Sequence, residues 1–315
     1  MDVAVLVVNA GSTSLKLSLV DANASRPVTW SDVPAHLRRI EAVAHRIVHG
    51  GDVYTEPVLV ADDVLAELQR LVELAPLHMK PALAALEAAR RAVPNVPHVA
   101  VFDTAFHRTV PPRARTYALP VRYRERGIHR FGFHGLSVQW ASEQVAVPRL
   151  VVCHLGGGCS VTAVLDGRSV DTTMGFTPLE GVPMGTRAGS VDPGALLYLL
   201  HHGVPLDELD EALEHESGLV GLAGTDDVAA LIASDAPGAR LALEIFAYRV
   251  AQAIAAMTIP LAGIDAVVFT GGIGENAAPL REQVVAQLSS LAPFDVHVVH
   301  AREDVVAARA ALAVL

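Results

Sequence analysis

Two glycine-rich turns in this chain follow apolar runs and carry residue types suited to binding phosphate. The first turn, 11–14, follows the apolar run 3–8, and the second, 156–160, follows the apolar run 150–153. In each, a Ser three residues after a Gly begins an outgoing run that an Asp closes. Glycine lets backbone N–H groups approach an anion closely, so each turn predicts a hairpin that faces a phosphate. The matched pair predicts two duplicated lobes and a phosphotransferase with ATP in the cleft.

A third turn has a similar character. Its sequence is T-G-G-I-G-E-N (270–276), and it follows the predicted strand 266–269. Its glycines allow close approach of a ligand, and the N-terminus of a following helix favours negative charge. We interpret it, beside the two hairpin turns, as part of the same nucleotide site.

The composition limits the class of protein. The chain has 315 residues, enough for two domains with separate cores. Its net charge of −10 argues against nucleic acid or an anionic membrane as the partner. Although 51% of residues are apolar, we find no run of the roughly 18–20 uninterrupted apolar residues that span a membrane. Two cysteines and the absence of a signal segment predict a cytoplasmic protein.

Hydrophobic periodicity predicts an α/β fold of two related lobes, each beginning with a hairpin. The predicted strands are the hairpins 3–21 and 150–166 and the segments 41–49, 98–102, 265–270 and 295–299. The predicted helices are 61–74, 81–93, 136–145, two after residue 193, 237–257, one from 279, and a terminal helix. Segments 22–40 and 171–192 are predicted to be irregular, and 271–276 to be a turn.

Nine stretches along the chain resemble the acetate kinase family. They are V-N-A-G-S-T-S-L-K (8–16), H-R-I-V-H-G-G (45–51), A-P-L-H (75–78), P-N-V-P-H-V-A-V-F-D-T-A-F-H (94–107), F-G-F-H-G (131–135), H-L-G-G-G (154–158), D-T-T-M-G-F-T-P-L-E-G (171–181), M-G-T-R (184–187) and G-G-I-G-E-N (271–276). They occur in family order over nearly the whole chain. The resemblance implies reversible, Mg²⁺-dependent, in-line phosphoryl transfer from ATP to acetate or propionate, giving ADP and the acyl phosphate.

The resemblance also implies the architecture. It indicates two duplicated lobes of the actin-like ATPase (ribonuclease H-like) superfold, with the active site in the cleft. We place the N-terminal, acyl-substrate lobe at 1–147 and the C-terminal, nucleotide lobe at 148–315, with a terminal helix able to pack back on the first lobe. A homodimer is the implied assembly.

A carboxylate acceptor is already ionised at neutral pH, so its phosphorylation requires alignment and charge neutralisation more than a general base. By resemblance, Arg46 and Arg187 supply these, and guanidinium groups suit both carboxylate and phosphoryl oxygens. His134 is implied to hydrogen-bond the transferring phosphoryl group. Asp103 matches an active-site acid that could act on a proton, orient an arginine or position a metal.

Substrate and metal residues follow from the same resemblance. The positions of a small apolar pocket for the acyl methyl group are occupied by Val48, Leu77, Phe133 and Pro178. One methylene is worth only about 1–3 kcal/mol, so these residue types do not separate acetate from propionate. Asn9 and Glu303 match metal-linked positions, although Glu303 equally suits the first turn of a helix.

The resemblance implies a larger set of nucleotide-binding residues. They are Ser14, Lys16, His154, Leu155, Gly156, Gly157, Gly158, Asp226, Gly272, Ile273, Gly274, Glu275 and Asn276. Two departures from the family pattern concern the binding of the phosphoryl donor. Gly157 stands where the family usually has Asn, and the segment at Asp226 is shortened and lacks an Arg. These changes leave open a related enzyme that uses pyrophosphate or another nucleotide.

A different class remains open as well, a nucleotide-binding regulator that kept the fold and lost turnover. The presence of Arg46, Asp103, His134 and Arg187 argues for turnover. A sugar kinase on the same superfold is less favoured, because a sugar hydroxyl normally requires a base rather than two arginines beside a methyl-sized pocket.

Overall fold

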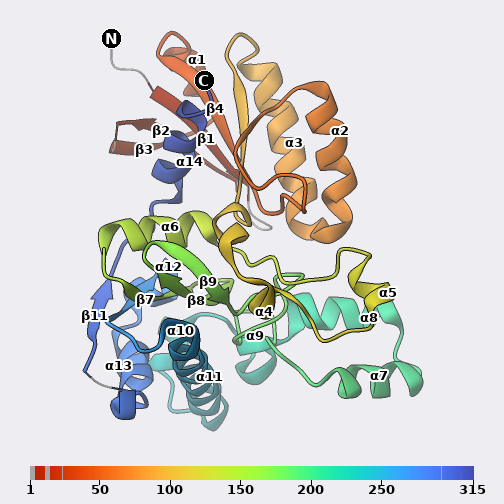
Figure 1. Ribbon diagram of the computed structural model, residues 1–315, viewed down its shortest axis with the longest axis vertical. Coiled ribbons are helices and arrows are strands. Elements are labelled where there is room, and N and C mark those ends of the chain that lie inside the picture. The colour runs from red at the N-terminus through yellow and green to blue at the C-terminus, as the bar shows by residue number, and fades with distance from the viewer. Residues whose placement is uncertain (1–3, 11–14, 23, 292) are drawn as a thin grey trace. The chain divides into compact units, whose positions relative to one another are not determined.

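The computed structural model describes residues 4–10, 15–22, 24–291 and 293–315. The predicted turn 11–14, with Ser14, lies outside the described residues. The chain divides into two compact units (Figure 1). Unit 1 extends up to Arg108 and includes Phe133–Trp140 and Arg302–Leu315, and unit 2 comprises Thr109–Gly132 and Ala141–Ala301. This division differs from the predicted boundary, because 109–132 and 141–147 group with the second unit.

The sheets of the two units share a five-stranded topology, to which unit 1 adds the antiparallel edge strand β5. The unit 1 sheet has the order β3-β2-β1-β4-β6-β5, and its strands are β1 (Ala4–Ala10), β2 (Leu15–Asp21), β3 (Ala24–Val28), β4 (Ile40–Ile47), β5 (Val58–Leu59) and β6 (His98–Phe102). The unit 2 sheet has the order β11-β10-β7-β8-β9, and its strands are β7 (Arg149–Leu155), β8 (Cys159–Leu165), β9 (Arg168–Thr172), β10 (Ala266–Thr270) and β11 (Asp295–Val298). In each, an antiparallel meander of three strands is followed by two strands parallel to the first. The predicted α/β fold of two duplicated lobes is confirmed.

The parallel strands bring chemically active residues to one end of each sheet. In unit 1, Asn9 on β1 lies opposite Arg46 on β4. The next residue of β4, Ile47, lies opposite Phe102, the last residue of β6, and Asp103 comes directly after Phe102. In unit 2, β7 and β10 pair His154 with Thr270. Both ends are the carboxyl ends of parallel strands, where open α/β sheets bind their ligands.

The core of unit 1 covers both faces of its sheet. Leu6 and Val8 on β1 belong to a cluster with α3 (Pro76–Ala92), whereas Val5 and Val7 belong to a cluster with α14 (Glu303–Leu312). Alternate residues of a strand point to opposite faces, so β1 is buried on both sides, as its continuous apolar run predicts. The C-terminal helix α14 thus belongs to the core of unit 1, and α2 (Asp62–Arg70) lies beside α3 (Figure 1).

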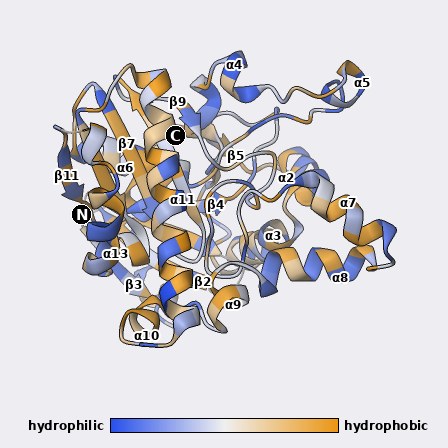
Figure 2. Ribbon diagram, turned by 90° about the horizontal axis from the view of Figure 1, so that it is seen from below, coloured by the Kyte–Doolittle hydropathy of each residue, from blue (hydrophilic) through white to orange (hydrophobic). Residues whose placement is uncertain are grey.

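Helix α11 (Pro237–Leu261) is the central helix of unit 2 and contacts β7, β8 and β9. By length and composition this helix could cross a membrane, although polar residues interrupt its apolar run. Figure 2 shows hydrophilic residues among its apolar ones. Ten of its residues, including Phe246 and Val250, are buried, and the core helix of a globular unit can have the same length and composition as a membrane span.

The remaining helices connect these elements. They are α1 (Val33–His36), α4 (Pro112–Arg115), α5 (Val121–Arg124), α6 (Gly135–Gln144), α7 (Pro193–His201), α8 (Leu206–Glu211), α9 (Gly218–Ala223), α10 (Val228–Ile232), α12 (Gly271–Asn276) and α13 (Ala278–Ala286). Short 3-10 segments occupy Leu71–Leu74, Ala105–Thr109 and Ser289–Leu291, and a π-helical turn occupies Ala212–Glu216.

The structure corrects several predicted elements. Segment 22–40 contains β3 and α1, and β9 ends inside the segment predicted to be irregular. Strand β3 has mostly half-exposed or exposed side chains and an internal Pro27, so it lacks the alternation that marks a strand. Residues 271–276 form the short helix α12 rather than a turn. Helix α3 begins at Pro76 rather than Pro81, because Pro76 occupies its first turn.

Candidate active site

Arg46 lies at the centre of a polar cluster in unit 1. Its Nε donates to Oδ1 of Asp103 at 2.9 Å, and its Nη2 donates to Oδ2 at 2.6 Å. Its Nη1 donates to Oδ1 of Asn9 at 3.0 Å and lies 3.5 Å from Oε2 of Glu303. The Asp103 side chain is only 1% exposed, so this bidentate pair is largely removed from water. Such a pair fixes both the position and the plane of the guanidinium.

The electrostatics of the pair favour a charged arginine. Burial alone would lower the pKa of Arg46, but the carboxylates of Asp103 and Glu303 raise it above its ordinary value. Burial raises the pKa of the Asp103 carboxyl, and Arg46 and the backbone N–H of His134 oppose that rise. Arg46 therefore stays cationic next to any anionic ligand.

His134 is held beside Asp103 by its backbone. It has a φ of 60°, an uncommon value for a residue with a side chain. The following N–H, of Gly135, donates to the carbonyl of Asp103 at 3.0 Å. A Cβ on Gly135 would lie 2.0 Å from that oxygen, so only glycine fits there. This constraint explains the glycine after His134 and brings His134 and Asp103 together.

The predicted acyl-pocket residues are divided between the units. Val48 and Phe133 are buried in unit 1, and Leu77, on the first turn of α3, is 37% exposed. Pro178 is buried in unit 2. The ring of His49 packs edge-on against Phe133, with centroids 5.5 Å apart.

Phe133 is also fixed through its backbone. Nε2 of His107 lies 2.9 Å from its carbonyl oxygen and donates to it. His107 is 3% exposed, and burial lowers its pKa to about 4. The histidine is therefore neutral at physiological pH and serves as a structural donor.

The two predicted metal-linked residues contact each other. Nδ2 of Asn9 donates to Oε2 of Glu303 at 3.3 Å. Within the described residues there is no cluster of three or more His, Cys, Asp and Glu side chains that could hold a metal. Mg²⁺ typically takes one or two protein oxygens and completes its shell with water and phosphate. An amide oxygen near the end of β1 and a carboxylate at the start of α14 fit that kind of site.

Arg187 is the buried arginine of unit 2. Its Nη1 donates to the carbonyl of Pro178 at 2.9 Å, and burial lowers its pKa, partly offset by the carboxylate of Glu214. The N–H groups of Ser217 and Leu219 donate to the carbonyls of Thr186 (2.9 Å) and Met184 (3.0 Å). The start of α9 thus holds the turn 184–187 that carries the arginine.

The predicted nucleotide turns of unit 2 lie against one another. The N–H of Gly185 donates to the carbonyl of Gly157 at 3.3 Å, and a Cβ on Gly185 would lie 3.1 Å from Oδ2 of Asp226. A Cβ on Gly156 would lie 3.7 Å from the nitrogen of Gly272, so the second and third glycine turns are adjacent. The structure therefore brings together turns that are about 115 residues apart in sequence.

Within the third turn, side chains brace the backbone. A carboxylate oxygen of Glu275 accepts from the N–H groups of Gly271 (3.0 Å) and Ala301 (2.9 Å). Nδ2 of Asn276 donates to the carbonyl of Gly272 at 2.8 Å. A Cβ on Gly272 would meet nothing within 4 Å, which leaves its backbone open to a ligand.

The other predicted nucleotide residues take positions set by the strands. Leu155 and Gly158 bound the tight turn, in which the N–H of Gly156 donates to the carbonyl of Gly158 at 3.0 Å. Ile273 and Gly274 lie inside α12. Lys16 is exposed on β2 and pairs with Asn9 in the sheet of unit 1.

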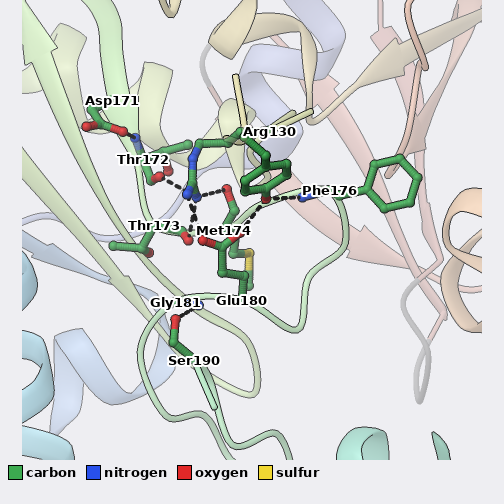
Figure 3. Close-up of polar contacts among 10 residues, drawn as sticks. Arg130, Asp171, Thr172, Thr173, Met174, Phe176, Glu180, Gly181 and Ser190 are labelled. Carbon is green, nitrogen blue, oxygen red and sulfur yellow. Dashed lines mark hydrogen bonds and ion pairs between the residues drawn. The ribbon is translucent and has the colours of Figure 1, made fainter. Parts of the chain in front are cut away.

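Sequence reasoning missed a polar network in unit 2. Arg130 forms an ion pair with Glu180 (Figure 3). The carboxylate of Glu180 also accepts from the hydroxyl of Tyr117. Arg130 directly precedes the F-G-F-H-G stretch, and Glu180 lies in D-T-T-M-G-F-T-P-L-E-G. Nothing in the sequence pairs two residues that are fifty positions apart.

Duplicated sheets, glycine turns at their strand ends and the arginines Arg46 and Arg187 are those of a phosphotransferase of the actin-like ATPase fold. The model of the Acetokinase family matches residues 28–309. The chain belongs to this family, which confirms the resemblance found in the sequence.

Individual relatives agree with this placement. The chain is 46% identical over 264 residues to an acetate kinase of Protochlamydia amoebophila, an alignment that covers 81% of this chain and 67% of that protein. The aligned stretch is thus about two thirds of the relative's length. The fold resembles a propionate kinase from Francisella tularensis (32% identity, TM-score 0.89, 99% of this chain and 100% of that one) and an acetate kinase from Porphyromonas gingivalis (28%, 0.87, 99% of each).

Proposed function

We propose that this protein catalyses reversible phosphoryl transfer between ATP and acetate or propionate, as the names of its relatives indicate for those proteins. The observation that carries the proposal is the bidentate hold of Asp103 on Arg46. Three of the five N–H donors of Arg46 are used by Asp103 and Asn9. Two remain, one on each Nη, and Nη1 also lies 3.5 Å from a carboxylate oxygen of Glu303. A planar pair of N–H groups of this kind suits a carboxylate or phosphoryl group.

The geometry favours one of the three roles considered for Asp103. Both of its carboxylate oxygens accept from Arg46, so its role is to orient the guanidinium rather than to move a proton. The acceptor carboxylate is already an anion, and direct in-line transfer needs no base. The apolar character of Val48, Leu77, Phe133 and Pro178 suits an acyl group with a short chain.

The remaining residues act on the phosphoryl group and the donor. Arg187 and His134 stabilise the charge on the transferring phosphoryl oxygens. The glycine turns of unit 2 present backbone N–H groups to the nucleotide phosphates. Asn9 and Glu303 would hold Mg²⁺ with their side-chain oxygens, and the ion would supply charge neutralisation when it is bound.

The cytoplasm and a homodimer complete the proposal. Cys153 and Cys159 are both free and buried, which suits a reducing compartment. The homodimer follows from the family resemblance.

The test is acyl phosphate formation, trapped as the hydroxamate, from acetate or propionate with Mg²⁺ and either ATP, GTP or pyrophosphate. Turnover with ATP is the expected result, and turnover only with another donor would overturn the assignment of ATP. Gly157→Asn provides a matched variant, because a Cβ there meets nothing within 4 Å. If the missing amide matters for ATP, this variant lowers the KM for ATP and leaves the KM for acetate unchanged.

A further inference from the structure

The three side chains of the network in unit 2 have no part in the function proposed above. Nη2 of Arg130 lies 2.7 Å from Oε1 of Glu180, and the hydroxyl of Tyr117 donates to Oε2. The Arg130 side chain is 15% exposed, and that of Glu180 is 35% exposed. An ion pair of this kind, with its second oxygen also bonded, holds its geometry better than a surface pair.

The network binds a loop that has no regular structure of its own. We define the bridging loop as residues 173–180, which follow β9 and precede the turn that carries Arg187. Nη1 of Arg130 donates to three consecutive carbonyls, those of Thr172 (3.0 Å), Thr173 (2.8 Å) and Met174 (3.0 Å) (Figure 3). The start of the bridging loop is thereby attached to one guanidinium.

The middle and the end of the bridging loop are attached to the same network. The N–H of Phe176 donates to the hydroxyl of Tyr117 at 2.9 Å, and Glu180 closes the loop with its own carboxylate. Directly before Phe176, Gly175 lets the network contact the backbone closely, since a Cβ there would lie 1.8 Å from Oε2 of Glu180. The loop is thus fixed at both ends and near its centre.

Pro178 lies between the fixed points at Phe176 and Glu180, and its carbonyl accepts from Nη1 of Arg187 at 2.9 Å. Arg187 is only 9% exposed, so water contributes little to its orientation. A hydrogen bond weakens steeply when its angle or length departs from the preferred range. A shift of the bridging loop therefore changes the direction in which the Arg187 guanidinium points.

We propose that Arg130 and Glu180 are positioning residues that orient Arg187 through the carbonyl of Pro178. The catalytic consequence rests on the function proposed above, in which Arg187 stabilises the transferring phosphoryl group. The structural consequence, which is the orientation of Arg187, does not rest on that function, because it is measurable in the absence of turnover.

The first experiment records the side-chain Nε–H signal of Arg187 by ¹⁵N NMR, assigned from its loss in Arg187→Lys. Arg130→Lys removes the planar fork that spans the three carbonyls and Glu180, and Glu180→Gln removes the charge. Both variants shift or broaden the Arg187 signal. Arg113→Lys, at an exposed position of the same segment, is the control and leaves it unchanged. An unchanged Arg187 signal in folded Arg130→Lys would overturn the proposal.

The second experiment is a double-mutant cycle on kcat. Arg130→Lys lowers kcat at least tenfold in the wild-type background and has no further effect in the Arg187→Ala background, with the KM for ATP unchanged in both. An equal fold-loss in the two backgrounds would show a general structural effect and overturn the proposal.

If Arg130→Lys does not fold, it is replaced by Tyr117→Phe, which releases Phe176 and one oxygen of Glu180. If the wild type lacks turnover, the function proposed above fails and the NMR result alone decides the positioning role.

Discussion

Both carboxylate oxygens of Asp103 accept from one edge of the Arg46 guanidinium, at 2.9 and 2.6 Å. The two residues come from neighbouring parallel strands. Arg46 is on β4, and Asp103 follows the last residue of β6. The pairing of these strands fixes the two backbones, and the ion pair fixes the direction of the remaining N–H donors. A site for an anionic ligand is therefore prepared before the ligand arrives.

Replacing Arg46 by lysine tests the need for this fork. Lysine keeps the charge but cannot donate to both oxygens of Asp103 and to a substrate carboxylate in fixed directions. We expect kcat/KM for acetate to fall about 100- to 1000-fold, or about 3–4 kcal/mol of transition-state stabilisation. Arg39→Lys, in an exposed pair with Asp21, is the control. Equal kinetics of Arg46→Lys and wild type would contradict the assignment.

Asp103→Asn tests what the pair contributes to stability. Removing one partner of a buried ion pair leaves the other charge uncompensated, which costs about 3–5 kcal/mol. We expect the lower end of that range in the free energy of unfolding from urea denaturation, because Glu303 remains 3.5 Å from Arg46. Asp21→Asn breaks an exposed pair and should cost less than about 1 kcal/mol. A similar loss in both variants would show that Arg46 and Asp103 are not coupled.

Acid pH should destabilise unit 1 through its buried histidines. Burial lowers the pKa of His107 to about 4 and that of His45 to about 3. An unfolded histidine titrates near 6.5, so between that pH and the folded pKa the unfolded chain binds more protons. Stability is thus fully present above pH 6.5 and falls by about 1.4 kcal/mol per pH unit for each such histidine as the pH decreases.

His107→Gln checks this linkage, because glutamine can still donate to the carbonyl of Phe133. The free energy of unfolding is measured by urea denaturation between pH 6.5 and 4.5. Its slope against pH should be smaller than in wild type by the amount that corresponds to about one fewer proton taken up on unfolding. His201→Gln, at an exposed position of α7, is the control and should keep the wild-type slope. An unchanged slope in His107→Gln would mean that this histidine is not held neutral.

Removal of divalent cations tests the roles of Asn9 and Glu303. We expect EDTA to abolish acyl phosphate formation and Mg²⁺ to restore it. Asn9→Ala removes an oxygen that also accepts from Arg46, and should raise the Mg²⁺ concentration for half-maximal rate about tenfold. Asn95→Ala, at an exposed position, is the control and should leave that Mg²⁺ concentration unchanged. Turnover that persists in EDTA would exclude the proposed metal dependence.

Local sequence features predict much of the fold because the strands are strongly apolar and bounded by glycine turns. Strand β6 has the predicted bounds, 98–102, and both hairpins form as predicted. The edge strands β3 and β9 were missed, since few of their side chains belong to a core and the hydrophobic pattern is weak. The short helix α12 was missed because its glycines have low helix propensity.

The chemistry at the strand ends is predictable only in part. Motif resemblance identified Arg46, Asp103 and Arg187 individually, but the bidentate geometry follows from a parallel strand register that the sequence does not state. The support of Arg187 by Pro178, Glu180 and Arg130 is a tertiary feature with no local signature. The residues proposed to touch ligands resemble those of the family, whereas the contacts that hold their side chains in place become visible only in three dimensions.

The central claim is a reversible phosphoryl transfer that depends on the Arg46 fork, and the reverse reaction tests it most directly. Purified protein is mixed with acetyl phosphate, ADP and Mg²⁺, and ATP formation is followed with a luciferase assay for the wild type and for Arg46→Lys. We expect the wild type to form ATP and the variant to do so at least about 100-fold more slowly. No ATP from folded wild type, or equal rates for the two proteins, would contradict the account.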